Sequence, residues 1–228
     1  MKIATLPKSG TYFFLNIVNY LRNDRGLTIE LDHVVMPNRP DFIDNITPTI
    51  ITSRDPRGYF YSLLNWYNRK SDDLMSGMMS SDIAYRYFDP NKVSKWATMT
   101  DEERLVALVD DTSDSLMIIK SRDSYNAILR AQSKPNCYIT TFERFAPAKD
   151  PSKFNADVMH EYIRMFEHIG IELDEGYIRT MIRACWGHSI TYTSNGVAAW
   201  SKHVPKSVQS RIVHRYSDVY AALGYPTG

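Results

Sequence analysis

Cysteine is scarce in this sequence, and long apolar runs are missing. The two cysteines, Cys137 and Cys185, are too few for a disulfide framework or a zinc quartet. No stretch approaches the roughly 20 apolar residues that a membrane span needs, so we expect none. The first ten residues, MKIATLPKSG, lack the apolar core and the cleavage site of a signal peptide. These absences together predict a cytoplasmic protein of a reducing compartment.

An excess of charge of one sign is also missing. Lys and Arg number 27 and Asp and Glu number 26, which leaves a net charge of +1. A non-specific nucleic-acid binder should be far more basic, so we expect no nucleic-acid partner. Apolar residues make up 43% and charged residues 23%, which argues against a disordered chain or a coiled coil. The length of 228 residues suits one domain.

Apolar periodicity predicts strands that alternate with helices. Strands are expected at residues 2–6, 27–35, 49–52 and 137–141. Helices are expected at residues 11–22, 57–69, 101–109, 122–132, 157–168, 174–185 and 206–223. This order predicts a single α/β domain over residues 1–228, with a P-loop-like, mostly parallel sheet flanked by helices. Residues 71–114 break the pattern and are expected to form an insertion or lid over one face of the sheet.

The segment Pro7-Lys8-Ser9-Gly10-Thr11 joins the first expected strand to the first expected helix. A helix N-terminus presents unpaired N–H groups and a partial positive charge. Gly10 allows close approach of a ligand, Lys8 adds a full charge, and the two hydroxyls add donors. The segment therefore suits either a phosphate or an ordinary strand-to-helix turn capped by serine. It is not a Walker A loop, because GxxxxGK[ST] is absent.

A second motif, Arg-Asp-Pro-Arg at residues 54–57, follows the strand expected at 49–52. Ligands of open α/β sheets gather at the carboxyl ends of the strands. Arg54 offers a fork of donors that suits a phosphate, and Ser62, about two turns into the next helix, could point to the same anion. Taken alone, the motif favours a surface arginine capped by Asp55.

Together with a late loop that contains Gly196, Trp200 and Lys202, these motifs resemble the sulfotransferases that use 3′-phosphoadenosine 5′-phosphosulfate (PAPS). The first motif is similar to the 5′-phosphosulfate loop of that family, PKSGTTW, with Tyr12 and Phe13 at its last two positions. The second motif has a serine eight residues after its first arginine, as in the family. Residues 142–145, FERF, resemble the family's YEDL segment at the end of a strand.

The resemblance implies which residues bind PAPS and its product PAP. The first motif would hold the 5′-phosphosulfate, the ring of its last aromatic residue would stack on adenine, and the second motif would hold the 3′-phosphate. The residues assigned to the donor are Lys8, Ser9, Gly10, Thr11, Tyr12, Phe13, Arg54, Ser62, Ser194, Asn195, Gly196 and Lys202. The late loop departs from the family's Arg-Lys-Gly-x-x-Gly-x-Trp, because serine and asparagine replace the basic pair and the Gly-to-Trp spacing is one residue shorter. We therefore expect weaker binding of the 3′-phosphate there, or binding by other donors.

A transferase of this class needs a general base for the acceptor hydroxyl. His33, near the end of the strand expected at 27–35, resembles the family's catalytic histidine, which lies in a KTHLP-like segment. The family's lysine two residues earlier is Leu31 here, and a structural pairing of His33 with Asp32 is the alternative. The other candidates for the base are His188, His203, Glu30 and Glu143.

These observations predict an enzyme that moves a sulfuryl group from PAPS to a hydroxyl or amine of a small-molecule, glycan or lipid acceptor. His33 would accept the acceptor proton, and Lys8 would neutralise the oxygen that leaves with PAP, so no metal is expected. Residues 36–45 and 71–114, including Met75, Met78 and Met79, would shape the acceptor pocket. A P-loop-type nucleotide kinase and a non-catalytic nucleotide- or glycan-binding protein on the same fold are the alternatives.

Overall fold

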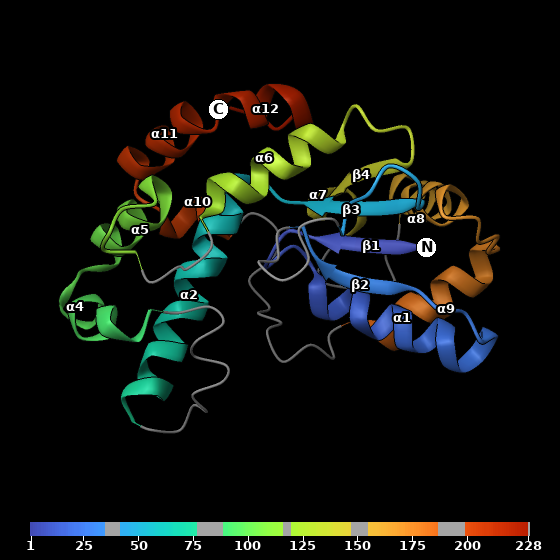
Figure 1. The fold of residues 1–228 in the computed structure, drawn as a ribbon, viewed down its shortest axis with the longest axis horizontal. Coiled ribbons are helices and arrows are strands. Elements are labelled where there is room, and N and C mark those ends of the chain that lie inside the picture. Colours follow the sequence, from blue (N-terminus) through green and yellow to red (C-terminus); the bar gives the residue numbers. More distant parts are fainter. Residues whose placement is uncertain (35–41, 77–88, 116–119, 147–154, 187–198, 228) are drawn as a thin grey trace. The chain divides into compact units, whose positions relative to one another are not determined.

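The computed structural model describes residues 1–34, 42–76, 89–115, 120–146, 155–186 and 199–227 (Figure 1). Contacts between Cα atoms divide the chain into two units. The first unit comprises Met1–Asp55 and Ala127–Ala198, and the second comprises Pro56–Asn126 and Ala199–Gly228. Helix α6 (Ser121–Ala131) crosses from the second unit into the first.

The first unit contains a parallel sheet of four strands. They are β1 (Lys2–Thr5), β2 (Glu30–His33), β3 (Thr49–Ser53) and β4 (Cys137–Thr141). Their order is β2-β1-β3-β4, and each adjacent pair runs parallel. The structure thus confirms the predicted α/β class with a parallel sheet flanked by helices. The strand expected at 27–35 is shorter than predicted, because only residues 30–33 pair with β1.

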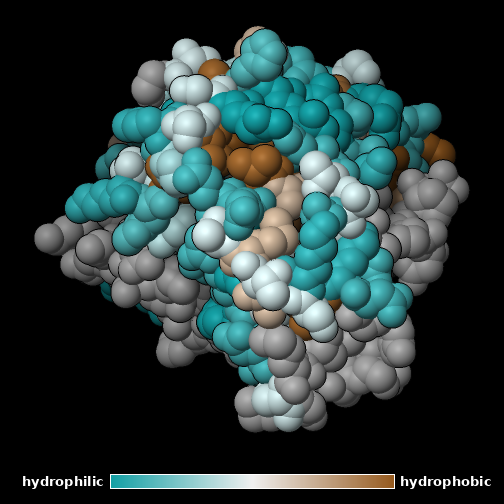
Figure 2. All heavy atoms as spheres, turned by 90° about the vertical axis from the view of Figure 1, so that its left-hand side faces the viewer, coloured by the Kyte–Doolittle hydropathy of each residue, from teal (hydrophilic) through white to brown (hydrophobic). Residues whose placement is uncertain are grey.

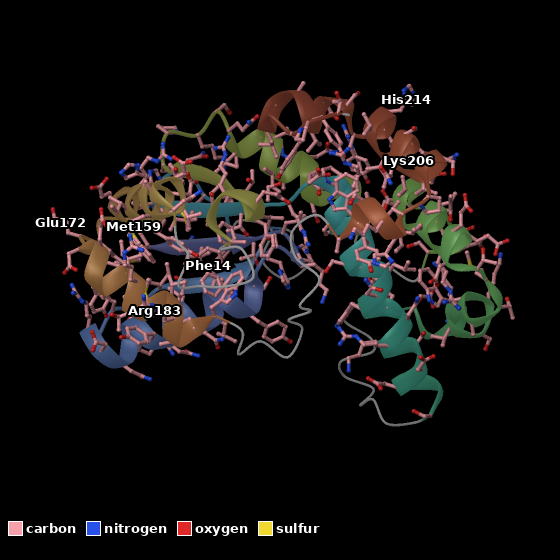
Figure 3. The ribbon with its side chains drawn as sticks, turned by 180° about the vertical axis from the view of Figure 1, so that it is seen from behind. Phe14, Met159, Glu172, Arg183, Lys206 and His214 are labelled. Atoms are coloured by element: carbon pink, nitrogen blue, oxygen red, sulfur yellow. The ribbon has the colours of Figure 1, made fainter. Side chains whose placement is uncertain are left out.

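One face of the sheet packs on a core that three helices complete. Ile3 lies beside Leu31 and Ile50, and Ile50 lies beside Tyr138, so one row of apolar side chains crosses the sheet. The helices are α1 (Thr11–Arg25), α8 (Ala156–His168) and α9 (Glu175–Cys185). Phe14 of α1 and Met159 of α8 are both buried in this core, as Figure 3 indicates. Burial of this apolar area is the main source of the unit's stability.

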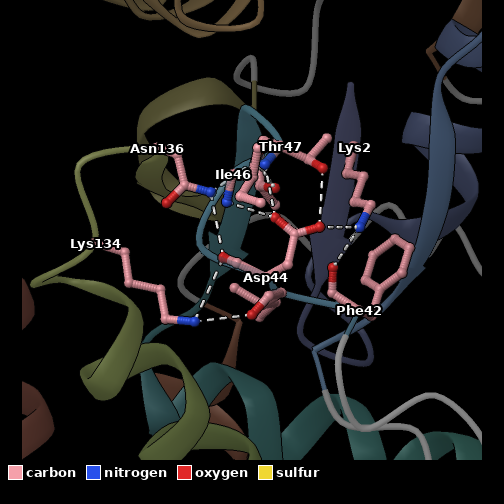
Figure 4. A network of polar contacts seen from close by, with 9 residues as sticks. Lys2, Phe42, Asp44, Ile46, Thr47, Lys134 and Asn136 are labelled. Atoms are coloured by element: carbon pink, nitrogen blue, oxygen red, sulfur yellow. Dashed lines mark hydrogen bonds and ion pairs between the residues drawn. The ribbon is translucent and has the colours of Figure 1, made fainter.

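A polar network fixes the amino ends of three strands around Asp44 (Figure 4). The Asp44 carboxylate pairs with Lys2 Nζ at 2.6 Å and accepts the Thr47 N–H at 2.6 Å. The Asp44 carbonyl accepts hydrogen bonds from Asn136 Nδ2 at 3.2 Å and Lys134 Nζ at 3.4 Å. The hydrogen bond from Lys2 has the largest effect on the pKa of the Asp44 carboxyl, and the hydrogen bonds from backbone N–H groups have the next largest. Together they hold this pKa well below its usual range. The network lies at the opposite end of the strands from the predicted site.

The second unit is helical. Its elements are α2 (Pro56–Met75), η1 (Pro90–Lys92), α4 (Val93–Thr98), α5 (Asp101–Asp110), α10 (Trp200–His203), α11 (Lys206–Arg215) and α12 (Ser217–Leu223). Buried aromatic rings of Tyr59, Tyr125 and Tyr216 form its core, with centroids 5.3–5.5 Å apart. Figure 2 shows a mostly hydrophilic surface with a narrow hydrophobic strip on the side where α4 and α5 lie.

Two predictions of helix boundaries in this unit are wrong. Helix α2 extends to Met75 rather than ending at Arg69, and Lys70 and Asp73 pair across its last turns at 2.6 Å. The C-terminal helix is divided in two, because the backbone of Tyr216 leaves the helical conformation between α11 and α12. Residues 71–114 contain the end of α2 and three short helical elements, and 77–88 lie outside the described residues. Their role as a lid stays a prediction.

No described helix has both the length and the apolar character that a membrane crossing requires.

Candidate functional site

The sheet order brings three of the predicted segments to one edge of the first unit. Strand β1 lies between β2 and β3, with Thr5 beside His33 on one side and Thr52 on the other. The Pro-Lys-Ser-Gly loop follows β1, His33 ends β2, and Arg54 follows β3. Because all three strands are parallel, these residues lie at the same carboxyl edge of the sheet, where ligands of such sheets bind.

The loop between β1 and α1 has the geometry of an anion-binding turn. Lys8 and Gly10 both have left-handed backbones, with φ values of 65° and 95°. The first bond of α1 runs from the Phe14 N–H to the Gly10 carbonyl at 2.9 Å. The N–H groups of Thr11 and Tyr12 precede that bond, so they lie at the positive end of a 15-residue helix. Such an arrangement can receive a phosphate or sulfate.

Ser9 occupies the loop differently from what was expected. Its side chain is fully buried, and its hydroxyl lies 2.5 Å from the Leu6 carbonyl and 2.8 Å from the Thr52 hydroxyl. The Ser9 N–H also donates to the Leu6 carbonyl, at 3.0 Å. This hydroxyl therefore already has protein partners, and its role as a phosphate donor stays a prediction. Ser9 fastens the loop to the neighbouring strand β3.

Arg54 connects the two motifs directly. Its Nη1 donates to the Lys8 carbonyl at 2.9 Å, and its guanidinium carbon lies 4.7 Å from the centroid of the Phe142 ring. The next residue, Asp55, donates its N–H to Glu143 Oε1 at 3.1 Å. Two contacts therefore orient the Arg54 guanidinium, one of them a cation–π contact on its face, and a third bond fixes the backbone of the next residue. A pre-oriented guanidinium loses little freedom when it binds an oxyanion.

His33 is held beside the same loop. Its Nδ1 lies 3.3 Å from the Thr5 carbonyl and 3.2 Å from the Thr5 hydroxyl, and that hydroxyl lies 2.8 Å from the Thr11 hydroxyl. Burial lowers the pKa of His33, and the charge of Lys8 lowers it further, while the Thr5 carbonyl and Asp32 oppose the shift. The imidazole is consequently neutral at pH 7. A proton on Nδ1, facing the Thr5 carbonyl, leaves the lone pair on Nε2.

The two aromatic residues that follow the loop differ in exposure. Phe13 is 5% exposed, and its ring packs against Phe145 at 6.3 Å and Trp186 at 5.1 Å. This ring packs in the core, and its stacking on adenine stays a prediction. Tyr12 is 43% exposed and is the aromatic side chain at the start of α1 that a ligand can reach.

Other predicted residues lie in the second unit or outside the described ranges. Ser62, half-buried, lies in α2, and exposed Lys202 lies in α10. Arg54 and Ser62 thus belong to different units. His203 is exposed and stacks on the Tyr61 ring at 5.3 Å. The late-loop residues Ser194, Asn195 and Gly196, together with His188, Met78 and Met79, lie outside the described residues.

The second arginine of the Arg-Asp-Pro-Arg motif has a structural role within the second unit. Arg57 is 2% exposed, and its Nη2 donates to the Pro226 carbonyl at 2.6 Å. Its guanidinium carbon lies 4.1 Å from the centroid of the Trp200 ring and 5.3 Å from that of Tyr220. Arg57 and Trp200 therefore fasten α10 and the C-terminus to the start of α2.

Sequence reasoning missed the threonines that end the strands. Thr5, Thr52 and Thr140 form one fully buried row across the sheet. The first two link the sheet to the loop through Thr11 and Ser9. The sequence does carry a signal for this row, because threonine recurs near the end of three short apolar strands. Their hydroxyls give the loop partners that purely apolar strands could not give.

A scan against protein-family models finds no match for this chain, and a search of curated proteins finds none either. Within the described ranges, no group of three or more His, Cys, Asp or Glu side chains could hold a metal ion.

Proposed function

We propose that this chain is a PAPS-dependent sulfotransferase with a P-loop-like donor site at the carboxyl edge of its sheet. The observation that supports the proposal best is the hydrogen bond from Arg54 to the Lys8 carbonyl. It joins the loop that would receive the 5′-phosphosulfate to the arginine that would receive the 3′-phosphate. Two motifs separated by more than forty residues thus act as one anion receptor.

The first unit supplies the groups that bind the donor. The N–H groups of Thr11 and Tyr12 and the charge of Lys8 would hold the 5′-phosphosulfate, and Arg54 would hold the 3′-phosphate. The exposed ring of Tyr12 is the group available beside them for a base or a sugar. Lysine and a helix terminus supply positive charge at the leaving oxygen, so the proposed reaction needs no metal.

His33 would act as the general base. Its lowered pKa keeps the imidazole neutral at pH 7, which is the form that accepts a proton. In the proposed step, the acceptor oxygen or nitrogen forms a bond to sulfur while the bond from sulfur to the 5′-phosphate oxygen breaks. PAP leaves with that electron pair, and His33 Nε2 takes the acceptor proton. Charge stabilisation by Lys8 would lower the barrier, as in phosphoryl transfer.

A nucleotide-binding measurement tests this proposal. Thermal unfolding of the wild-type chain is followed with PAP and, in parallel, with ADP and with ATP and magnesium. At one hundred times its dissociation constant, a ligand adds about 2.7 kcal/mol to the free energy of unfolding. We expect stabilisation by PAP and much less by ADP, which lacks a 3′-phosphate. Preference for ATP with magnesium would favour the kinase instead, and PAP binding without sulfuryl transfer to any acceptor would favour the non-catalytic binding protein.

A cytoplasmic reaction with a hydroxyl- or amine-bearing small molecule, glycan or lipid belongs to the same proposal. PAPS is a soluble nucleotide, and a cytoplasmic location fits the scarcity of cysteine. Screening acceptors of the three classes with PAPS, and measuring PAP release, identifies the acceptor class.

A further inference from the structure

The short helix α7 (Phe142–Phe145) contacts both halves of the candidate anion site. A Cβ atom added to Gly10 would lie 3.3 Å from Phe145 Cζ and 3.5 Å from Phe142 Cδ2. The Phe142 ring also lies against the Arg54 guanidinium, and Glu143 accepts the Asp55 N–H. Helix α7 therefore lies against the loop after β1 and the turn after β3.

The carboxyl group of Glu143 is only half satisfied. Oε1 accepts the Asp55 N–H, while Oε2 is inaccessible to water and has no hydrogen-bond partner among the described residues. A buried polar atom without a partner costs about 1–3 kcal/mol, and more when it is charged. Such costs are concentrated at functional sites, because selection for folding alone removes them. A purely structural role does not account for this buried oxygen without a hydrogen-bond partner. The arrangement therefore points to a functional role of Glu143.

We propose that Glu143 is a positioning residue of the anion site, whose carboxyl fixes the turn after β3 and so holds Arg54 toward the loop that contains Lys8. This inference rests on the proposed donor site and adds a role that the family resemblance does not assign. A direct role as the general base does not fit, because Oε2 is buried and cannot reach an acceptor hydroxyl.

The charges around Glu143 link this positioning role to the protonation of its carboxyl group. Burial raises the pKa of the Glu143 carboxyl, Asp55 raises it further, and the neighbouring Arg54 lowers it. Arg54 also donates to the Lys8 carbonyl, and the Tyr162 hydroxyl of α8 donates to the Phe145 carbonyl. An anion bound by Arg54 offsets the charge that favours the carboxylate. Anion binding should therefore raise the pKa of Glu143 further, which favours uptake of a proton from solvent.

Two variants of Glu143 and one matched control separate positioning from general stability. Glu143→Gln keeps an oxygen that can accept the Asp55 N–H but cannot ionise, whereas Glu143→Ala removes the acceptor. Glu161→Gln is the control, because Glu161 is also a buried carboxylate of the first unit, but its side chain bonds Thr140 of β4 and Arg164 of α8. All three are compared with wild type by thermal unfolding.

Three measurements follow the role of Glu143. Hydrogen exchange of the Asp55 amide reports the turn without any ligand. Binding of PAP and of inorganic pyrophosphate is measured by calorimetry in buffers of different ionisation enthalpy, which also counts the protons taken up. We expect Glu143→Ala to speed exchange and to weaken binding about tenfold, as for the loss of one hydrogen bond that orients a charged group. We expect Glu143→Gln to bind within about threefold of wild type but to take up fewer protons.

Each outcome decides the proposal. It is supported if Glu143→Ala loses affinity, Glu143→Gln retains it without the proton uptake, and Glu161→Gln changes stability alone. It is overturned if Glu143→Ala binds and exchanges as wild type does, or if all three variants lose affinity only in proportion to stability. Binding of pyrophosphate with this pattern, but not of PAP, would refute the sulfotransferase and keep the positioning role. Failure of the wild type to bind either anion would overturn both.

Discussion

Gly10 packs so closely against Phe145 that a side chain at its position would crowd the ring. A Cβ atom at Gly10 would approach Phe145 Cζ to 3.3 Å, and the Gly10 backbone has a φ of 95°. The glycine is thus favoured twice, once by the conformation and once by the neighbouring ring.

The first prediction compares two left-handed glycines. Gly26, which ends α1, has a φ of 66° and nothing within 4 Å of an added Cβ. Gly26→Ala should lower the free energy of unfolding by about 1 kcal/mol, from the backbone alone. Gly10→Ala should cost about 1–3 kcal/mol more, because the Phe145 ring must also move. Thermal or denaturant unfolding measures both, and equal losses would show that the ring yields without cost.

The fold was largely readable from the sequence because its strands and helices are short and strongly patterned. The apolar positions of α1, from Phe13 to Leu21, repeat at helical spacing and are buried as predicted. The boundary errors fall where local pattern is weak. Helix α2 continues through the polar residues Ser71, Asp72 and Asp73 to Met75, and the C-terminal helix is interrupted at Tyr216, whose ring packs in the aromatic core.

The site was predictable in its placement but not in its packing. Motif order placed Lys8, His33 and Arg54 at strand ends, and the parallel sheet puts those ends at one edge. Sequence could not reveal that Ser9 faces inward. Residues at consecutive positions of a turn differ in direction through backbone angles alone, and Lys8 has a φ of 65°, which few residues other than glycine adopt.

Lys8 allows charge and backbone conformation to be tested separately. Lysine already bears the steric cost of the left-handed region, so Lys8→Ala should fold about as stably as wild type, and Lys8→Asn at least as stably, because asparagine tolerates that region. Both variants lack the cation at the proposed leaving oxygen, so we expect kcat for sulfuryl transfer to fall about a hundredfold or more in each. Steady-state kinetics with PAPS measures this, and unchanged turnover in Lys8→Asn would exclude the catalytic role of Lys8.

Ser9 should prove structural. Ser9→Ala removes the bonds to the Leu6 carbonyl and the Thr52 hydroxyl, and should cost about 1–2 kcal/mol of folding stability. Ser133→Ala is the matched control, because that exposed serine also donates to the carbonyl three residues earlier. We expect the control to change stability by less than about 0.5 kcal/mol. A Ser9→Ala variant as stable as the control, but weak in PAP binding, would restore Ser9 to the ligand.

Arg54 should determine discrimination between nucleotides. Lysine cannot reproduce the guanidinium fork or its contact with the Phe142 ring, so Arg54→Lys should weaken PAP binding about tenfold or more. Binding of ADP should change much less, because that nucleotide has no 3′-phosphate. Arg144→Lys, at an exposed position of α7, serves as the control. If Arg54→Lys weakened both nucleotides equally, Arg54 would serve the loop and not the 3′-phosphate.

Protonation of His33 should produce the acidic limb of the pH profile, in which kcat/KM falls as pH decreases. The folded-state pKa of His33 lies below 6.5, so the base is neutral at pH 7 and becomes protonated only at lower pH. We therefore expect kcat/KM to fall as pH decreases through that lowered pKa, and His33→Gln to abolish the limb along with most activity. Asp32 raises the pKa of His33, so Asp32→Asn should move the limb to lower pH. A limb that moves to higher pH in Asp32→Asn would assign it to another group.

The lowered pKa of His33 also predicts how the stability of the chain depends on pH. The unfolded chain binds a proton at His33 more readily than the folded chain, because the folded-state pKa is lowered. Stability from this group is complete above pH 6.5 and is lost as pH falls from there through the folded-state pKa. His33→Gln should therefore flatten the pH dependence of the unfolding free energy in that window. Since this measurement needs no substrate, it tests the burial of His33 independently of sulfuryl transfer, and an unchanged slope would show that His33 is already solvated.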